Sequence, residues 1–155
     1  MASNEKAKTS QPESLRLVAF DSADLEVIST HLQDALVRVA GMTYQAAQKR
    51  FALVASRFDW MAAEAGAPQR CESGLHFDHV QAVSLQGFDQ KDGKRLLNLL
   101  DISFSESDTP SGHVVLTFSG EAAVRLTVEC LDVQMSDIGA RWKTRRKPGH
   151  GSGED

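Results

Sequence analysis

A chain of 155 residues with 41% hydrophobic and 25% charged residues has the composition of a soluble globular protein that can build its own core. No apolar run approaches the roughly 18 residues needed to cross a bilayer, and the polar first residues lack the apolar centre of a secretory signal. The net charge of −4 belongs to a mildly acidic body with a basic end, which does not fit a duplex-binding domain.

The two cysteines, Cys71 and Cys130, are too few for a disulfide framework. Because the chain shows no export signal, we predict that both are thiols in the reducing cytoplasm, without membrane association. Cys71 lies in a polar stretch and is expected to react readily with an alkylating reagent. Cys130 is in phase with the apolar residues of a predicted strand and is expected to react only on unfolding.

The chain begins with a predicted flexible leader, because residues 1–14 are polar and aperiodic. Residues 15–20 are the first predicted strand. Asp21 is a suitable N-cap for residues 23–32, whose leucine and isoleucine residues recur at helical spacing. We therefore predict one strand followed by a helix of about three turns.

The next segments predict two strands and a loop. Residues 35–44 alternate as a strand does, and residues 50–60 follow as a strand that is apolar on both faces at its start. Residues 62–74 are small and polar and contain glycine and proline, which predicts a loop.

Residues 75–88 resume a strand pattern, in which His79 and Gln81 interrupt the apolar face. This interruption predicts either a bulge or two buried polar groups. Residues 91–100 are leucine-rich at the i, i+3 and i+4 positions, which predicts a short helix. The alternation at residues 101–105 predicts a fifth strand.

The clearest stretch is residues 112–132, where two runs of alternating apolar and polar residues flank a break. This pattern is typical of an antiparallel hairpin with one buried face. A slip of one residue would place polar side chains on the apolar face, so matching faces predict the register. The predicted opposite pairs are Phe118 and Val124, Leu116 and Leu126, and Val114 and Val128.

After the hairpin, Leu131, Met135 and Ile138 fall on one helical face, which predicts a C-terminal helix. A disordered tail is predicted over residues 143–155. Five of the seven residues from 141 to 147 are basic, but most such runs are simply solvated.

Together these segments predict a single α+β domain over residues 15–142. Its centre is a strongly bent, mostly antiparallel sheet, or a partly open barrel, of about seven strands. An N-terminal helix, a short middle helix and a C-terminal helix accompany the sheet. The predicted number of strands, seven, and the terminal helix are similar to those of the pleckstrin-homology-like barrel. This likeness carries no functional information.

Several separated segments of the chain also carry a resemblance to a known family. They are HLQDALVRV, RFALVASRFDW, GLHFDHV and PSGHVVLTFSGEAAVRLTVECLD. Together they are similar to a proteobacterial family, domain of unknown function 2948, over about residues 15–148. The resemblance implies a small bacterial cytoplasmic protein, and it brings no activity, cofactor or functional residue with it.

Cys71, His76 and His79 form a C-x4-H-x2-H pattern of residue types that bind zinc. On a strand, however, a step of three residues directs His76 and His79 to opposite faces. No second ligand pair follows at the spacing of a zinc finger. We therefore predict no metal site and no cofactor.

His113 and Glu129 face each other in the predicted register, on the polar side of the hairpin. A histidine beside a carboxylate can begin an acid–base pair, but cross-strand polar pairs are also ordinary surface contacts. The surface interpretation is favoured. The sequence contains no nucleophile-elbow or phosphate-loop motif, so no catalytic residue is predicted.

These observations predict a non-catalytic binding or scaffolding module that acts through a protein partner or through its own copy. The alternative is a small-molecule-binding protein or enzyme with a pocket at a barrel mouth, which requires His79 and Gln81 to point into a cavity. Nucleic-acid contact through the basic tail is a further alternative, favoured less.

Overall fold

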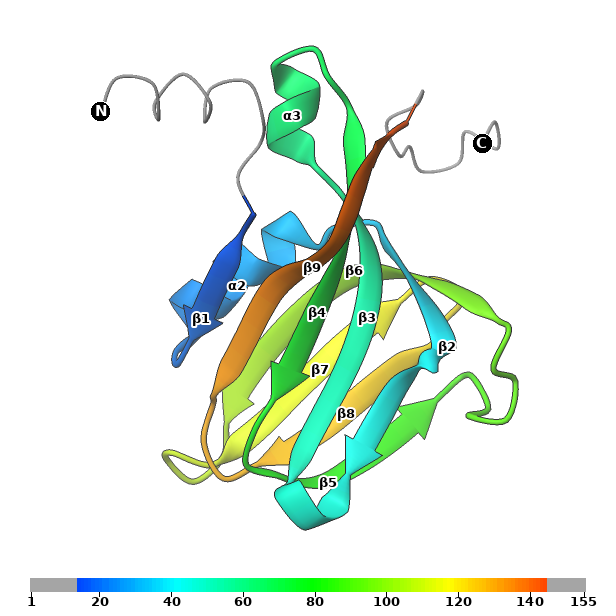
Figure 1. Ribbon diagram of the computed structural model, residues 1–155. Coiled ribbons are helices and arrows are strands. Elements are labelled where there is room, and N and C mark those ends of the chain that lie inside the picture. The colour runs from blue at the N-terminus through cyan, green and yellow to red at the C-terminus, as the bar shows by residue number, and fades with distance from the viewer. Residues whose placement is uncertain (1–13, 145–155) are drawn as a thin grey trace.

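The computed structural model describes residues 14–144, with the backbone alone at residues 140, 141 and 143. This part of the chain forms one nine-stranded antiparallel sheet in the order β1-β9-β4-β3-β2-β6-β7-β8-β5 (Figure 1). The strands are β1 (Arg16–Ala19), β2 (Ala35–Gln45), β3 (Arg50–Phe58), β4 (Gln69–Phe77), β5 (Val80–Gln86), β6 (Leu96–Glu106), β7 (Gly112–Phe118), β8 (Ala123–Val128) and β9 (Val133–Lys143). The helical elements are α2 (Ser22–His31), the 3-10 turn η1 (Ala46–Gln48) and α3 (Trp60–Glu64).

The sheet folds back on itself into two layers. In Figure 1, β9, β4, β3 and β2 form the front layer, and β6, β7, β8 and β5 lie behind it. β2 belongs to both runs of pairing, and its register with β3 shifts between Val37 and Met42 at a bulge. The bulge therefore lies in β2, the strand at which the sheet bends from the front layer to the back layer.

The edge strand of the back layer, β5, approaches β2 and the turn after it without forming a ladder. The amide of Val80, in β5, donates to the carbonyl of Lys49 at 2.8 Å. The hydroxyl of Tyr44, in β2, donates to the carbonyl of Val80 at 2.8 Å. β2 and β5 are not neighbours in the sheet, so the sheet is not closed. We call the line along which β2 and β5 meet the seam.

α2 forms where the sequence predicts it and covers one end of the core. Asp21 is its N-cap, with Oδ1 accepting from the Asp24 amide at 2.9 Å. Leu25 and Ile28 are buried in the core between the layers. The hydroxyl of Ser29 accepts from the Ile102 amide at 3.0 Å, which ties the helix to β6.

The hairpin predicted over residues 112–132 is confirmed as β7 and β8, with the predicted apolar side buried. The predicted register is wrong by two residues, because Leu116 lies opposite Val124, and Val114 lies opposite Leu126. A shift of two residues keeps every side chain on its own face, so the face assignment is unaffected.

A tight turn causes this difference in register. The amide of Phe118 donates to the carbonyl of Ala122 at 2.8 Å and closes the hairpin. The loop between the two strands is therefore shorter than the loop in the predicted register. Gly120 and Glu121 adopt φ angles of 71° and 63°, the left-handed conformation that short hairpin loops require.

Two segments predicted as helices are strands. Residues 91–100 form a turn followed by the start of β6, in which Leu97 and Leu99 are buried and Leu96 is exposed. The helix predicted over residues 131–138 is replaced by β9, which pairs with β1 on one side and β4 on the other. The α+β class and the bent antiparallel sheet hold. The seven strands, the middle and C-terminal helices and the pleckstrin-homology-like arrangement are wrong for the described residues.

The middle of the chain also differs from the prediction. The strand predicted at residues 50–60 ends at Phe58, because the Asp59 carboxylate caps the first turn of α3. The loop predicted at residues 62–74 contains the end of α3 and the start of β4. The single strand predicted at residues 75–88 is the end of β4, a turn, and β5.

The predicted leader and tail lie outside the described residues except for residues 14, 143 and 144. Trp142 belongs to β9, where it lies opposite Arg70 and is 45% exposed. Of the basic run over residues 141–147, the first three residues therefore continue a sheet strand. No helix in the described range is long and apolar enough to cross a membrane.

Candidate functional site

The three residues of the predicted zinc pattern do not converge. Cys71 faces the core from β4 and is 1% exposed. His76 lies on the other face of β4, with Nδ1 3.5 Å from the Asp78 carboxylate. His79 lies in the turn before β5, at a φ of 61°, with Nε2 3.3 Å from the Asp132 carboxylate. Within the described part of the chain, no three potential ligands form a group that could hold a metal.

The expected order of cysteine exposure is wrong. Cys71 is buried because β4 begins before it, where the sequence predicts a loop. Cys130 is half-buried because β8 ends before it, at Val128. Burial, followed by the nearby charges of Asp132 and Glu129, raises the pKa of the Cys130 thiol.

We expect iodoacetamide to modify Cys130 in the folded protein and Cys71 only after unfolding. The reaction at Cys130 should accelerate as the pH rises toward its raised pKa, because the thiolate is the nucleophile. Peptide mass spectrometry before and after adding urea measures both sites. Cys130→Ser is the matched control, since it should remove all labelling of the folded protein. Faster labelling of Cys71 than of Cys130 in the folded state would contradict the burial described above.

The predicted pairing of His113 with Glu129 is wrong. The Nε2 atom of His113 lies 3.1 Å from Nη2 of Arg125 instead. Glu129 accepts from Lys49 Nζ at 3.3 Å and from Gln81 Nε2 at 3.2 Å. These hydrogen bonds, that from Lys49 first, lower the pKa of the Glu129 carboxyl.

His79 and Gln81 belong to this same surface cluster. The Nδ1 atom of His79 lies 3.8 Å from Glu129, and its side chain is 47% exposed. Gln81 is exposed and donates to Glu129. Neither residue lines either of the two concavities described below. In the described part of the chain, His79 and Gln81 therefore belong to a surface cluster around Glu129.

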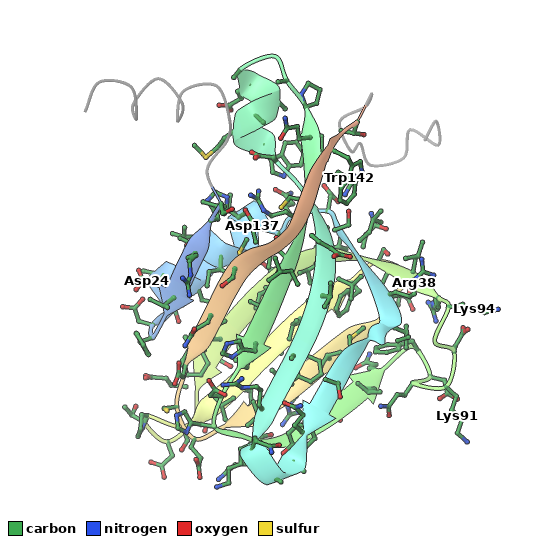
Figure 2. All side chains as sticks on the ribbon, in the orientation of Figure 1. Asp24, Arg38, Lys91, Lys94, Asp137 and Trp142 are labelled. Atoms are coloured by element: carbon green, nitrogen blue, oxygen red, sulfur yellow. The ribbon has the colours of Figure 1, made fainter. Side chains whose placement is uncertain are left out.

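A buried polar cluster, which no sequence pattern indicated, joins β3 to β9. Arg57 forms a bidentate ion pair with Asp137, with Nε–Oδ1 and Nη2–Oδ2 distances of 2.8 Å. Both side chains are 2% exposed. The Ser73 hydroxyl donates to Asp137 at 2.6 Å, and the Leu15 amide donates at 2.9 Å. Asp137 lies on β9 close to β1, as Figure 2 shows.

This cluster is built to stay charged. Burial alone would raise the pKa of Asp137, but the hydrogen bonds from Arg57, Leu15 and Ser73 outweigh it and hold the pKa well below the ordinary value. Burial and then the Arg57 charge lower the pKa of His31, so this histidine is neutral at neutral pH. A carboxylate whose pKa is this low is a weak base, and the cluster serves to hold the strands together.

The front layer carries a concavity on its outer face, at the bulge of β2. It has a volume of about 460 Å³ and is walled by side chains of β2, β3, β4 and β6. Among the described residues no helix covers this face, which is turned toward the viewer in Figure 1. We call this concavity the outer groove. Its lining includes Leu36, Arg38, Val54, Glu72 and Leu96.

The outer groove carries aliphatic side chains at outward positions of β3 and β6, the strands on either side of β2. Val54 is 39% exposed and Leu96 is 51% exposed. Ile138, which is 58% exposed, lies over Gly74, the residue opposite Val54. The apolar surface therefore continues from the groove toward β9, and exposed apolar surfaces of this kind mark interaction sites.

One cation and one anion line the outer groove. Arg38 lies at the edge of the front layer (Figure 2), where Nη1 donates to the Lys94 carbonyl at 3.2 Å. Glu72 lies against Gly139 of β9, where any added Cβ would come within 2.7 Å of the Glu72 side chain. Gly139 therefore leaves the space that Glu72 occupies. Arg38 and Glu72 are the only charged residues among those that line the groove.

Comparison with known proteins gives one match. The model of a family described as "Protein of unknown function (DUF2948)" matches residues 15–150. No curated protein and no solved structure matches the chain. The family match spans nearly all of the described fold, including every residue of the outer groove.

Proposed function

We propose that this chain, which belongs to the DUF2948 family, is a non-catalytic binding module that associates with a second copy of itself through the outer groove. The observation that supports the proposal is a bare sheet face in which exposed Val54, on β3, lies between Arg38 on β2 and Glu72 on β4. Exposed Leu96 lies beyond Arg38, on β6. Burial of such aliphatic side chains is the main driving force of association.

The charges favour a second copy over an unrelated partner. A surface with a net charge would repel its own copy, but the outer groove carries one positive and one negative side chain and is neutral as a whole. In a two-fold arrangement the same patch meets itself, so Arg38 of each copy faces Glu72 of the other. Val54 of each copy then meets its counterpart near the axis, and Leu96 lies outside the charged pairs.

A charge-swap experiment tests this arrangement. Wild-type protein is expected to form a dimer that dissociates on dilution through the micromolar range, as measured by sedimentation equilibrium. Arg38→Glu and Glu72→Arg should each weaken the dimer by roughly tenfold or more, because each variant puts like charges together twice. An equimolar mixture of the two variants should regain wild-type affinity, since every contact in the mixed dimer again joins opposite charges.

Lys91→Glu is the matched control, because it makes the same charge change on the exposed loop before β6, outside the groove. It should leave the dissociation constant of the dimer unchanged. Monomeric wild-type protein throughout the micromolar range would refute self-association. A dimer that neither single variant weakens would place the contact on another surface.

A further inference from the structure

The seam holds a second concavity that is separate from the outer groove. It has a volume of about 250 Å³ and is lined by side chains of β2, β3 and β5 and of the segment that follows β5. Met42 and Tyr44 come from β2, Phe51 from β3, Val83 from β5, and Phe88 from the segment after it. We call it the seam pocket.

The seam pocket exists because the sheet does not close. Where strands pair, side chains of neighbouring strands fill the interior to high density. In the described part of the chain, β5 is hydrogen-bonded to Tyr44 of β2 and to Lys49 of the following turn through Val80. The side chains farther along the seam stay apart. Mouths of open and closed barrels are a common place for small-molecule sites.

All the residues that line the seam pocket are uncharged. The Tyr44 hydroxyl is already engaged, since it donates to the Val80 carbonyl at 2.8 Å. The side chains of Thr43 and Gln90, which also line the pocket, make no hydrogen bond to any other part of the described chain. A carboxylate or phosphate bound here would lose hydration without gaining a cation from the pocket wall.

The geometry points to a binding site for a small neutral molecule that has an aromatic ring system and one hydrogen-bonding group. Phe51 and Phe88 offer aromatic surface, and Met42 can adapt its shape to a ring. Thr43 and Gln90 offer the hydrogen bonds that fix the orientation of such a ligand. A volume of about 250 Å³ is below the roughly 300 Å³ at which pockets for drug-sized molecules begin, so the ligand is small.

Two probes of the same shape test the inferred ligand class on the full chain. 2-Naphthamide is neutral, and 2-naphthoate has the same ring system with a carboxylate. Saturation-transfer NMR should detect 2-naphthamide, and the methyl resonances of Met42 and Val83 should shift on its addition. The naphthoate is expected to bind roughly tenfold or more weakly, because its charge is not compensated in the pocket. Equal or tighter binding of the naphthoate would overturn the proposal and direct attention to Lys91, beside Gln90 in the chain.

Three variants locate the binding. Val83→Trp should fill the seam pocket and abolish the signal from 2-naphthamide, whereas Val54→Trp in the outer groove should leave it unchanged. Gln90→Ala, at an exposed position that cannot affect the core, should weaken binding several-fold even if Val83→Trp fails to fold. No saturation transfer from either probe, or methyl shifts that persist in both Val83→Trp and Gln90→Ala, would refute the site. Loss of dimerisation in the charge-swap experiment would leave this result untouched.

Discussion

Replacing Asp137 with asparagine is expected to lower the free energy of unfolding by about 3–5 kcal/mol, because it removes the bidentate carboxylate partner of the buried Arg57 guanidinium. Asp59, the other carboxylate near Arg57, is 3.9 Å away and makes the weaker contact. The two side chains are 2% exposed, so water cannot replace the lost partner. Urea unfolding near neutral pH, followed by circular dichroism, measures the effect.

An exposed ion pair in the same protein provides the control. Arg50 and Asp78 approach to 2.7 Å, as closely as the buried pair, but the Arg50 side chain is 42% exposed. Asp78→Asn is therefore expected to cost about 1 kcal/mol or less. Similar losses for Asp78→Asn and Asp137→Asn would show that burial does not determine the strength of these contacts.

The buried pair of Arg57 and Asp137 also makes the free energy of unfolding depend on pH. The pKa of Asp137 is lowered in the folded state, so its contribution is fully present above the ordinary value of 3.8 and is lost as the pH falls through the lowered value. The difference in unfolding free energy between wild type and Asp137→Asn should therefore be constant from about pH 7 to pH 5 and shrink below about pH 4. A difference that shrinks well above the ordinary value would contradict the lowered pKa.

Leu116→Ala is expected to lower the free energy of unfolding by about 2–5 kcal/mol, because it opens a cavity in the middle of the core. Leu116 is 0% exposed and lies opposite Val124 in β8 and Ile102 in β6. Thr117→Ala, one position along the same strand on the half-exposed face, should cost much less. Equal losses at the two positions in urea melts would mean that the face assignment of β7 is wrong.

The hairpin and α2 could be predicted because their signals are local. In β7 every second residue is apolar, a pattern that fits a strand and does not fit a helix. Asp21 supplies the cap of α2 three positions from the amide it binds. Neither inference requires knowledge of a distant part of the chain.

The start of β6 was misassigned because its pattern fits two structures. Leu96, Leu97, Leu99 and Leu100 match the spacing of a helix, and they also place Leu97 and Leu99 on one face of a strand. Pairing with β2 and β7 decides in favour of the strand. In this strand Leu96 is exposed and lines the outer groove. Because the sequence pattern predicted a helix here, it could not predict the groove.

By itself, the sequence determined the α+β class, the first helix and the buried faces of the central hairpin, since each depends on residues a few positions apart. The tertiary structure alone decided the hairpin register, the number of strands, the buried Arg57–Asp137 pair and the two concavities. The physical reason is distance along the chain: Leu15 and Asp137 bond across 122 positions, and Arg57 and Asp137 across 80. No local period encodes which distant strands meet, and the outer groove and the seam pocket lie where that pairing is interrupted.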